Sequence, residues 1–305
     1  MDKKIIYQDK KRERIDAYLK TYLRISRERT KLLLKEGLIL VRNSEVEPSY
    51  ILKNGDEILI KEGCLDRATE NKLLPEKYQL EIIYYDNDIV VINKPAGILI
   101  HPTEKIRSGT MVNFLLDITP LPDTDNPLRP GVVHRLDRET SGVMVFARTY
   151  SAWENLVLQF KNRMVEKEYL AIVKGNFYPL RKEVEFTVSH SKENHTIKME
   201  VHYLKGKKAV SVIEVVRYIN GLTLVKVKPL TGRTHQIRLT LSHLGYPVIG
   251  DAIYGIKSNL ISRVALHSYK ISFYHPSTKE RCQFKANIPD DFLKITGKIN
   301  IDNAG

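Results

Sequence analysis

The acidic residue Asp137 lies in the arginine-rich stretch GVVHRLDRETSGVMVFA. Two β-branched runs, Val132–Val133 and Val143–Phe146, flank nine mostly polar residues, a pattern typical of two strands joined by a loop. Arg135 and Arg138 lie beside Asp137 in this loop. Because nearby cations favour an ionised carboxylate, we expect Asp137 to be charged and available for chemistry at neutral pH. A surface loop whose charges only pair with one another would show the same residues.

A second stretch, LTGRTHQIRLTLSHLG, follows a strand-like run and predicts a helix over His235–Leu244. Arg233, His235 and Arg238 all fall at or near its first turn. Arginines at a helix start oppose the helix dipole, so they need an anionic partner, and the free amides there also favour an anion. This arrangement suits a phosphate or a carboxylate better than simple solvation of a helix end.

Other polar residues carry weaker signals. Tyr169 begins an apolar strand, where a tyrosine usually packs in the core with its hydroxyl at the rim. His134, His235 and His243 lack HxH or HExxH spacing, so the sequence gives little support for a metal site. The absence of GxGxxG and GxxxxGK[ST] loops argues against a nucleotide cofactor.

The elements that must position these residues are mostly strands. Eight apolar runs separated by turn signals predict strands: Leu80–Tyr85, Ile89–Ile92, Val132–Val133, Val143–Phe146, Tyr169–Val173, Val184–Val188, Val210–Val216 and Leu222–Val227. Helical periodicity is confined to about Met111–Leu116, Trp153–Phe160 and His235–Leu244. The predicted fold class is therefore α+β, with a mixed, largely antiparallel sheet rather than a doubly wound parallel one.

Residues 1–64 predict a small, separate α+β domain with a basic N-terminal arm. Apolar spacing between residues 14 and 34 indicates two short helices, the second beginning near Ser26 and ending at Gly37. Strand-like pieces follow at 38–41, 51–52 and 57–60. The polar residues 65–77 read as a linker, residues 78–295 as the main domain and residues 296–305 as a tail.

The charge of the chain suggests a nucleic-acid partner. Its 305 residues carry a net charge of +13 and a pI near 9.5, which favours a polyanion. Residues 1–42 hold about twice as many basic as acidic residues. Four of the basic residues cluster at the predicted helix junction: Arg24, Arg27, Arg29 and Lys31. This cluster is equally consistent with an RNA contact and with a solvated helix face.

Composition also indicates the cellular compartment in which the protein is expected. The two distant cysteines, Cys64 and Cys282, indicate neither a disulfide framework nor a zinc site, and they fit a reducing compartment. The N-terminus lacks the apolar core of a signal peptide, and no stretch approaches the roughly 20 apolar residues of a membrane helix. We therefore expect a cytoplasmic protein that does not insert in a membrane.

Five blocks, in this order, resemble the RluA-type family of pseudouridine synthases: INKPAGILIHP, HRLDRETSGVMVFAR, KEYLAIVKG, LTGRTHQIRLTLSHLGYPVIGDAIYG and LHSYKISFYHPST. They span most of residues 78–290. Residues 14–61, with their RIDAYL opening and SYILKNGDEI ending, are similar to the alpha-L RNA-binding domain that precedes the catalytic domain in many members.

The resemblance implies isomerisation of uridine to pseudouridine in RNA, without a metal or organic cofactor. It implies that Asp137 is the catalytic residue, that Tyr169 stacks on the base or abstracts the C5 proton, and that Arg238 pairs with the aspartate. It also implies a set of substrate-binding residues, in which Arg135 holds the flipped nucleotide and Leu266 lines the pocket: His134, Arg135, Thr140, Arg233, His235 and Leu266. The target uridine must leave its stack to reach such a pocket.

Large-subunit ribosomal RNA is the expected substrate and a monomer the expected state. Three other interpretations remain open: the same chemistry on transfer RNA, a non-catalytic RNA-binding or ribosome-assembly protein, and a phosphodiesterase that uses His134, Asp137 and His235. Retention of Asp137, Tyr169 and Arg238 together argues against a lapsed enzyme.

Overall fold

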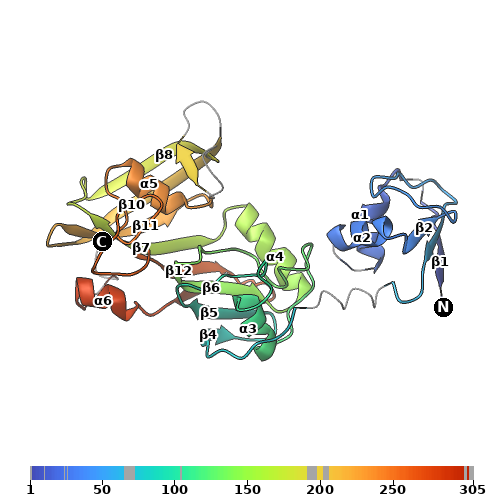
Figure 1. The fold of residues 1–305 in the computed structure, drawn as a ribbon, viewed down its shortest axis with the longest axis horizontal. Coiled ribbons are helices and arrows are strands. Elements are labelled where there is room, and N and C mark those ends of the chain that lie inside the picture. The colour runs from blue at the N-terminus through green and yellow to red at the C-terminus, as the bar shows by residue number, and fades with distance from the viewer. Residues whose placement is uncertain are drawn as a thin grey trace. The chain divides into compact units, whose positions relative to one another are not determined.

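The computed structural model describes residues 2–9, 11–23, 25, 27–64, 73–103, 105–190, 198–201, 206–298 and 301. The chain forms two compact units (Figure 1). The first unit comprises Met1–Tyr78, His101–Val132 and Arg148–Trp153, and the second comprises Gln79–Ile100, Val133–Ala147 and Glu154–Gly305. The domain boundaries inferred from the sequence stay a prediction.

The N-terminal part of the first unit is a three-stranded antiparallel sheet with two helices. The strands are β1 (Lys3–Ile6), β2 (Ile39–Val41) and β3 (Glu57–Ile60), in the order β1-β3-β2. The helices are α1 (Ile15–Leu23) and α2 (Arg27–Lys35). Their buried faces meet those of the strands in one apolar cluster that includes Leu19, Leu34 and Ile58. The first unit also contains α3 (Met111–Ile118), which is capped at its start by Thr110.

Most elements predicted for this part of the chain are confirmed. Both helices, the strand at 57–60 and the end of α2 before Gly37, whose φ is +63°, occur as expected. The predicted strand at 51–52 is wrong, because Ile51 makes only an isolated bridge with Arg14. Strand β1 was not predicted as a strand, since its polar, basic residues resemble an arm. Ser26, the expected helix cap, lies outside the described residues.

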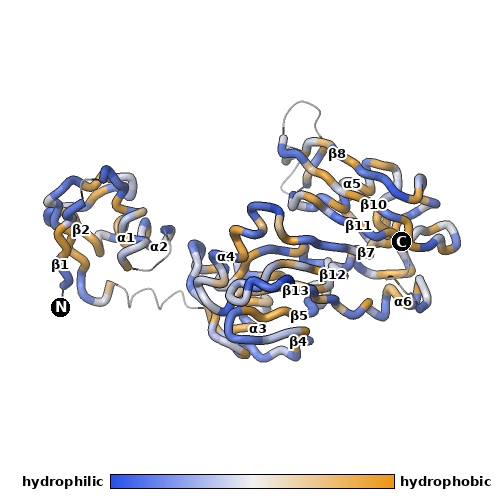
Figure 2. Tube along the Cα trace, turned by 180° about the vertical axis from the view of Figure 1, so that it is seen from behind, coloured by the Kyte–Doolittle hydropathy of each residue, from blue (hydrophilic) through white to orange (hydrophobic). Residues whose placement is uncertain are grey.

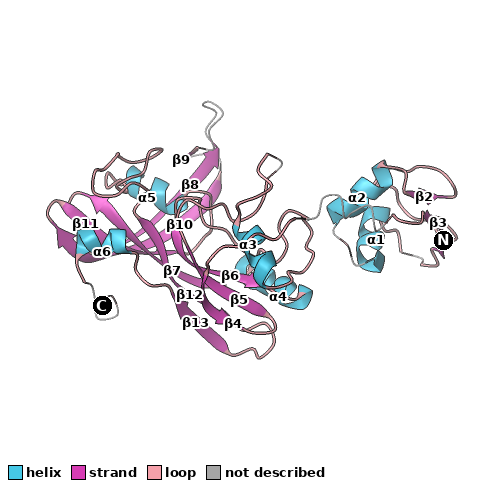
Figure 3. Ribbon diagram, turned by 60° about the horizontal axis from the view of Figure 1, so that its bottom comes forward, coloured by secondary structure: helices cyan, strands magenta, loops and turns pink. Residues whose placement is uncertain are grey.

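The second unit contains one twisted sheet of ten strands (Figure 3). Nine strands follow the order β4-β5-β6-β12-β7-β11-β10-β8-β9, and β13 pairs with β12. Their bounds are β4 (Glu81–Tyr85), β5 (Ile89–Lys94), β6 (Ser141–Ala147), β7 (Glu166–Lys174), β8 (Arg181–His190), β9 (Met199–Val201), β10 (Lys207–Ile219), β11 (Leu222–Pro229), β12 (Leu266–Tyr274) and β13 (Arg281–Lys285). Only the β6–β12 pair among them is parallel, so the expected mixed, largely antiparallel α+β fold is confirmed.

Three further helices are α4 (Tyr150–Lys161), α5 (Gln236–His243) and α6 (Asp290–Thr296). Helix α5 contacts β9, β10 and β11, where Leu239 joins Val188, Met199 and Ala209 in an apolar cluster. Strand β5 is mostly hydrophobic (Figure 2) and pairs with β6, which is buried along its whole length. Among the described residues, no helix is both long and apolar enough to span a membrane.

The central strands meet at one point that only glycine permits. Gly142 has φ of +116°, and a Cβ atom there would lie 2.1 Å from the backbone oxygen of Ser268 on β12. This close approach joins β6 to β12 and fixes the place from which the preceding loop, 133–140, emerges. Of the strands that the sequence predicts around that loop, the second occurs as β6. The first, Val132–Val133, is wrong, because two residues are too few for a ladder and the Val132 carbonyl instead accepts the Trp153 indole N–H.

Candidate active site

A cavity of about 960 Å³ lies in the second unit, between the loop 133–140, the β7 strand and the start of α5. Its volume falls within the range of small-molecule sites, about 300–1,000 Å³. All nine catalytic and substrate-binding residues inferred from the sequence line it: His134, Arg135, Asp137, Thr140, Tyr169, Arg233, His235, Arg238 and Leu266. These residues come from four separate stretches of sequence, so the fold gathers one site.

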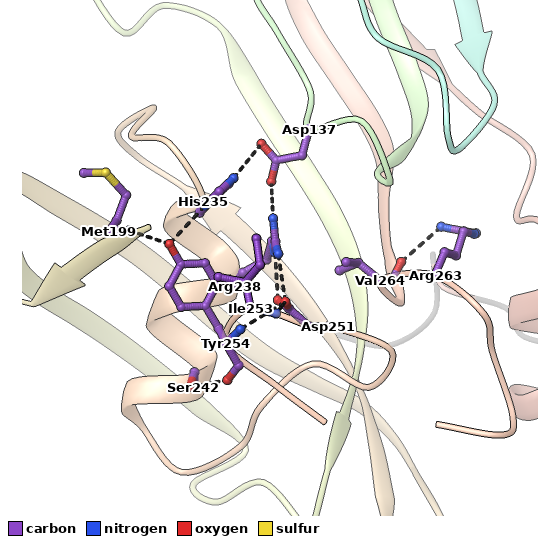
Figure 4. A network of polar contacts seen from close by, with 10 residues as sticks. All are labelled: Asp137, Met199, His235, Arg238, Ser242, Asp251, Ile253, Tyr254, Arg263 and Val264. Carbon is purple, nitrogen blue, oxygen red and sulfur yellow. Dashed lines mark hydrogen bonds and ion pairs between the residues drawn. The ribbon is translucent and has the colours of Figure 1, made fainter. Parts of the chain in front are cut away.

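The Asp137 carboxylate faces two groups of α5 (Figure 4). Arg238 Nη1 donates a hydrogen bond of 3.1 Å to Asp137 Oδ2, and His235 Nε2 lies 3.9 Å from Asp137 Oδ1. The Asp137 side chain is 21% exposed, so it is open to the cavity. The cations that flank it in the sequence do not supply its partner, since Arg138 Nε instead donates to the Gly97 carbonyl oxygen.

Arg238 is held from its other side by Asp251. Its Nε and Nη2 atoms donate two hydrogen bonds of 2.7 Å to the two oxygens of this fully buried carboxylate. Burial alone would lower the pKa of Arg238, but the bonds and charge of Asp251, and then Asp137, raise it. Burial would likewise raise the pKa of Asp251, and the bonds and charge of Arg238 lower it. The anion that the start of α5 requires is therefore a pair of carboxylates from the protein itself.

A buried lysine supports the loop that carries Asp137. The Lys94 ammonium, 0% exposed, donates to the carbonyl oxygens of Pro95, Arg138 and Thr140 at 2.8, 3.0 and 3.0 Å. Gly97 N also donates to the Arg138 carbonyl, at 2.9 Å. Burial lowers the pKa of Lys94 to about 7. Because three carbonyl acceptors match the three N–H bonds of an ammonium, they favour its charged form and fix the backbone on the C-terminal side of Asp137.

The wall opposite α5 combines apolar and hydroxyl groups. Burial, and then the charge of Asp137, raise the pKa of Tyr169 to about 12, so its phenol is neutral. A neutral phenol suits stacking and hydrogen-bond donation better than proton abstraction. Leu266 is 4% exposed and adds an apolar surface. The buried Thr140 hydroxyl has no hydrogen-bond partner among the described residues.

His134 has a structural environment at the rear of the cavity. Its ring stacks on Phe160 with centroids 4.8 Å apart, and its Nε2 accepts the backbone N–H of Val145 at 3.1 Å. Burial, with a smaller effect of Lys167, lowers the pKa of His134 to about 3. A neutral imidazole whose free nitrogen is already occupied cannot serve as the acid of an acid–base pair at neutral pH. This geometry argues against the phosphodiesterase interpretation.

Basic side chains surround the mouth of the cavity. Arg233 Nε donates to the Lys208 carbonyl oxygen at 2.9 Å, which orients its guanidinium, while Arg135 is exposed. Lys167 lies two residues before Tyr169 on β7 and lines the same cavity, and burial lowers its pKa. These cations give the site the positive potential that an RNA backbone requires.

The residues inferred for RNA binding in the N-terminal domain do not all have the same environment in the structure. Arg27 makes two hydrogen bonds, of 2.9 and 3.1 Å, to Asp16, which is fully buried in α1 and also binds Arg14. Arg27 therefore contributes to the fold of this domain, because it pairs with a buried carboxylate. Lys31 lies on α2, as does Arg29, whose side chain is outside the described part of the structure; Arg24 is outside it altogether.

Sequence reasoning missed Lys94, Asp251 and Tyr254 as parts of the site. Each lies within a block that resembles the family. However, a lysine at the end of a strand and an acid after a glycine are usually interpreted as exposed residues, which is why Lys94 and Asp251 were missed. An acid inside the otherwise apolar run VIGDAIYG was the available signal for Asp251. Among the described residues, no three His, Cys, Asp or Glu side chains gather as a metal-ion site would require.

The arrangement combines a carboxylate clamped by an arginine, a neutral tyrosine, an apolar wall and a basic rim. Such a site can hold one flat base beside a charged carboxylate while cations bind the flanking phosphates. It thus suits carboxylate chemistry on a nucleotide of a larger RNA.

Comparison with known proteins identifies the family. Residues 88–243 match the RNA pseudouridylate synthase family. The chain is 37% identical to an uncharacterized RNA pseudouridine synthase of Aquifex aeolicus, over 93% of this chain and 92% of that one. It is 35% identical to the ribosomal large subunit pseudouridine synthase D of Neisseria meningitidis, over 95% and 79% of the two chains.

A solved structure agrees with these sequence relatives. Human RNA pseudouridylate synthase domain containing 1 superposes with a TM-score of 0.57 at 26% identity, covering 69% of this chain and 84% of that one. The chain therefore belongs to the RluA-type family of RNA pseudouridine synthases, enzymes that isomerise uridine to pseudouridine in RNA.

Proposed function

We propose that this enzyme modifies specific uridines of large-subunit ribosomal RNA and that Asp137 is its catalytic carboxylate. The observation that carries the second part is the hydrogen bond between Arg238 and Asp137 inside the cavity. The relative from Neisseria meningitidis is named for the large ribosomal subunit, which supports the first part. The charge of +13 is consistent with a large structured RNA.

The isomerisation breaks the N1–C1′ bond of uridine and forms a C5–C1′ bond after the uracil has turned. The C5 proton leaves to solvent and N1 gains a proton, so the mass of the nucleotide is unchanged. This rearrangement requires an ionised carboxylate close to the nucleotide in a pocket that excludes most water. Arg238 supplies a permanent positive charge and a hydrogen-bond donor to Asp137 in this site.

The other residues of the cavity have separate proposed roles. Tyr169 stacks on the uracil and Leu266 forms the apolar wall behind it. The Thr140 hydroxyl, which has no hydrogen-bond partner in the described part of the chain, offers a hydrogen bond to the substrate. Arg135 occupies the position beside the carboxylate from which a cation can hold the nucleotide out of its helix, and Arg233 binds a flanking phosphate. Extruding the base costs a few kcal/mol, which such phosphate contacts and stacking offset.

We assign residues 1–64 to a separate RNA-binding domain, joined through residues 65–77 to a catalytic domain at 78–295 and a tail at 296–305. In this proposal Arg24, Arg29 and Lys31 contact RNA outside the target nucleotide. In this proposal the enzyme acts as a cytoplasmic monomer.

Tritium release from RNA labelled at uridine C5 tests the function. Transcripts of large-subunit ribosomal RNA should release tritium with the wild-type enzyme, whereas a transfer RNA pool should not. Release from transfer RNA alone would move the substrate to that class. Pseudouridine mapping in ribosomal RNA from cells with and without the enzyme should locate the target, and identical maps would contradict the ribosomal assignment.

A further inference from the structure

His235 occupies an unusual backbone position directly below Asp137. It precedes α5 with φ of 54° and ψ of 20°, in the left-handed region that residues other than glycine rarely adopt. This conformation places the imidazole between two partners: Nε2 lies 3.9 Å from Asp137 Oδ1, and Nδ1 lies 3.0 Å from Tyr254 Oη (Figure 4). Strained backbone of this kind is kept where the surrounding structure requires the side chain in one place.

The hydrogen bonds of Tyr254 indicate which way the proton points. Its hydroxyl oxygen accepts the backbone N–H of Met199 at 2.6 Å, so the donor of that bond is known. The hydroxyl hydrogen can then point to His235 Nδ1, which lies 3.0 Å from Oη. If Nδ1 carried the proton instead, the buried phenol would accept two bonds and leave its own hydrogen unused.

The protonation state of the His235 imidazole determines which nitrogen carries its hydrogen. Burial, partly offset by the charge of Asp137, lowers the pKa of His235, so the ring is neutral at pH 7 and carries a single N–H. Burial also raises the pKa of Tyr254, which keeps its phenol a donor. When Tyr254 donates to Nδ1, the single N–H of the ring must be at Nε2 and point toward Asp137.

The same short turn controls the second donor to Asp137. Asp251, three residues before Tyr254, binds Arg238 with both oxygens, and its Oδ1 accepts the backbone N–H of Tyr254 at 3.1 Å. The Arg238 guanidinium also lies over the Tyr254 ring, 5.3 Å from its centroid. One segment, 251–254, thus holds both side chains that face the two carboxylate oxygens.

We propose that Tyr254 is a positioning residue that fixes His235 as an Nε2–H donor to Asp137 Oδ1, while Asp251 fixes Arg238 as the donor to Oδ2. The inference rests on the proposed catalytic role of Asp137. The distance of 3.9 Å is too long for a hydrogen bond, and a small movement on RNA binding would close it, as catalytic contacts commonly tighten with substrate. The carboxylate would then be oriented by two donors from α5.

A double-mutant cycle on kcat tests the coupling. With an RNA that releases tritium, Tyr254→Phe should lower kcat about 10- to 100-fold, the order typical of partners that fix a histidine tautomer at a metal site, with KM unchanged. In His235→Gln, whose amide can donate without Tyr254, adding Tyr254→Phe should cost less than about twofold. An equal loss in both backgrounds would mean that Tyr254 does not act through His235, and would overturn the proposal.

Ser242→Ala is the matched control for loosening of the segment. Ser242 Oγ donates to the Tyr254 carbonyl oxygen at 2.6 Å but does not touch His235. This variant should lower the melting temperature as Tyr254→Phe does while keeping kcat. A kcat as low as that of Tyr254→Phe would show that general loosening explains the effect, which contradicts the proposed role.

Nitrogen-15 NMR of histidine-labelled protein provides a test that needs no activity. In the wild-type enzyme at pH 7, the His235 ring should show a protonated Nε2 and an unprotonated, hydrogen-bonded Nδ1, and the Nδ1 signal should move toward an unbonded nitrogen in Tyr254→Phe. A protonated Nδ1 would refute the proposal whatever the kinetics. Because this readout is independent of Asp137, it separates failure of the inference from failure of the proposed function.

Discussion

Arg238 and Asp137 lie 101 residues apart in the sequence, yet Arg238 Nη1 donates to Asp137 Oδ2 at 3.1 Å. Arg238 is 6% exposed and Asp137 is 21% exposed, so the cation is fixed in the wall and the carboxylate is open to the cavity. The two bonds from Arg238 to Asp251 make the guanidinium a rigid link between a buried carboxylate and the accessible one. This link holds a permanent positive charge and a hydrogen-bond donor against the Asp137 carboxylate.

Arg238→Lys should therefore abolish most of the activity although it keeps the charge. A lysine cannot bind Asp251 with two nitrogens and reach Asp137 with a third. We expect kcat to fall about 100-fold or more, the order seen when one preorganised donor is removed, together with a lower melting temperature because the Asp251 carboxylate loses its partner. Single-turnover tritium release and thermal unfolding measure the two effects. Wild-type kcat in this variant would show that charge alone is sufficient.

Lys94→Met should disturb the loop that carries Asp137, because it removes the ammonium that binds the loop's carbonyl oxygens. The carbonyl oxygens of Pro95 and Thr140 would lose the Lys94 donor and that of Arg138 would keep Gly97 N, at a cost of about 1–3 kcal/mol for each buried group left unpaired. Both the melting temperature and kcat should therefore fall while RNA affinity is retained. The exposed Lys257→Met is the matched control and should change neither quantity. If Lys94→Met keeps full kcat at a temperature where it remains folded, the lysine has no part in positioning the loop.

Buried neutral histidines should make the fold sensitive to acid. Burial lowers the pKa of both His134 and His267 to about 3, from 6.5. Between those values the unfolded chain binds protons that the folded chain does not, so stability is lost as the pH falls below about 6.5. The fully buried His267 alone should contribute about 1.4 kcal/mol per pH unit.

Chemical denaturation at a series of pH values between 7 and 4.5 measures this slope. His267→Leu should remove the share of the slope that His267 contributes, whatever it does to the stability at pH 7. A slope identical to that of the wild-type protein would show that His267 is not kept neutral by the fold.

Two substitutions in the N-terminal domain should separate structure from RNA contact. Arg27→Ala removes two of the four arginine hydrogen bonds to the buried Asp16 carboxylate and leaves those of Arg14, so this variant should lower the stability of the domain by a few kcal/mol. Lys31→Ala should weaken RNA binding and should lower stability less than Arg27→Ala does, because Lys31 is partly exposed and a phosphate contact adds affinity but not fold. Filter binding at two salt concentrations and thermal unfolding distinguish these outcomes. Equal loss of stability in both variants would contradict the separation.

Local patterns in the sequence predicted where most strands lie along the chain, whereas the residues of the candidate site were inferred mainly from the resemblance to a family. Apolar runs revealed β5, β6, β7, β10 and β11, and a misfit between arginines and a helix start indicated that α5 needs an anion. What local patterns could not predict are long-range pairings. That anion proved to be Asp251 as well as Asp137, and the cations beside Asp137 in the sequence do not pair with it.

Several elements also escaped prediction for physical reasons. Strands β12 and β13 were not recognised as strands, since their polar residues follow turn-like flanks and their ladders form with distant partners. The sequence around Lys94 does not indicate that this lysine is buried or that its ammonium donates to three carbonyl oxygens. Such groups are stable only because the completed fold supplies their partners.

The most direct test of the account compares the wild-type enzyme with Asp137→Asn in tritium release from C5-labelled large-subunit ribosomal RNA. Asparagine keeps the size of the side chain but cannot provide an ionised carboxylate, so the variant should bind the RNA with unchanged affinity and release no tritium above background. Release at the wild-type rate by a folded Asp137→Asn protein would contradict the central claim that this carboxylate drives the isomerisation.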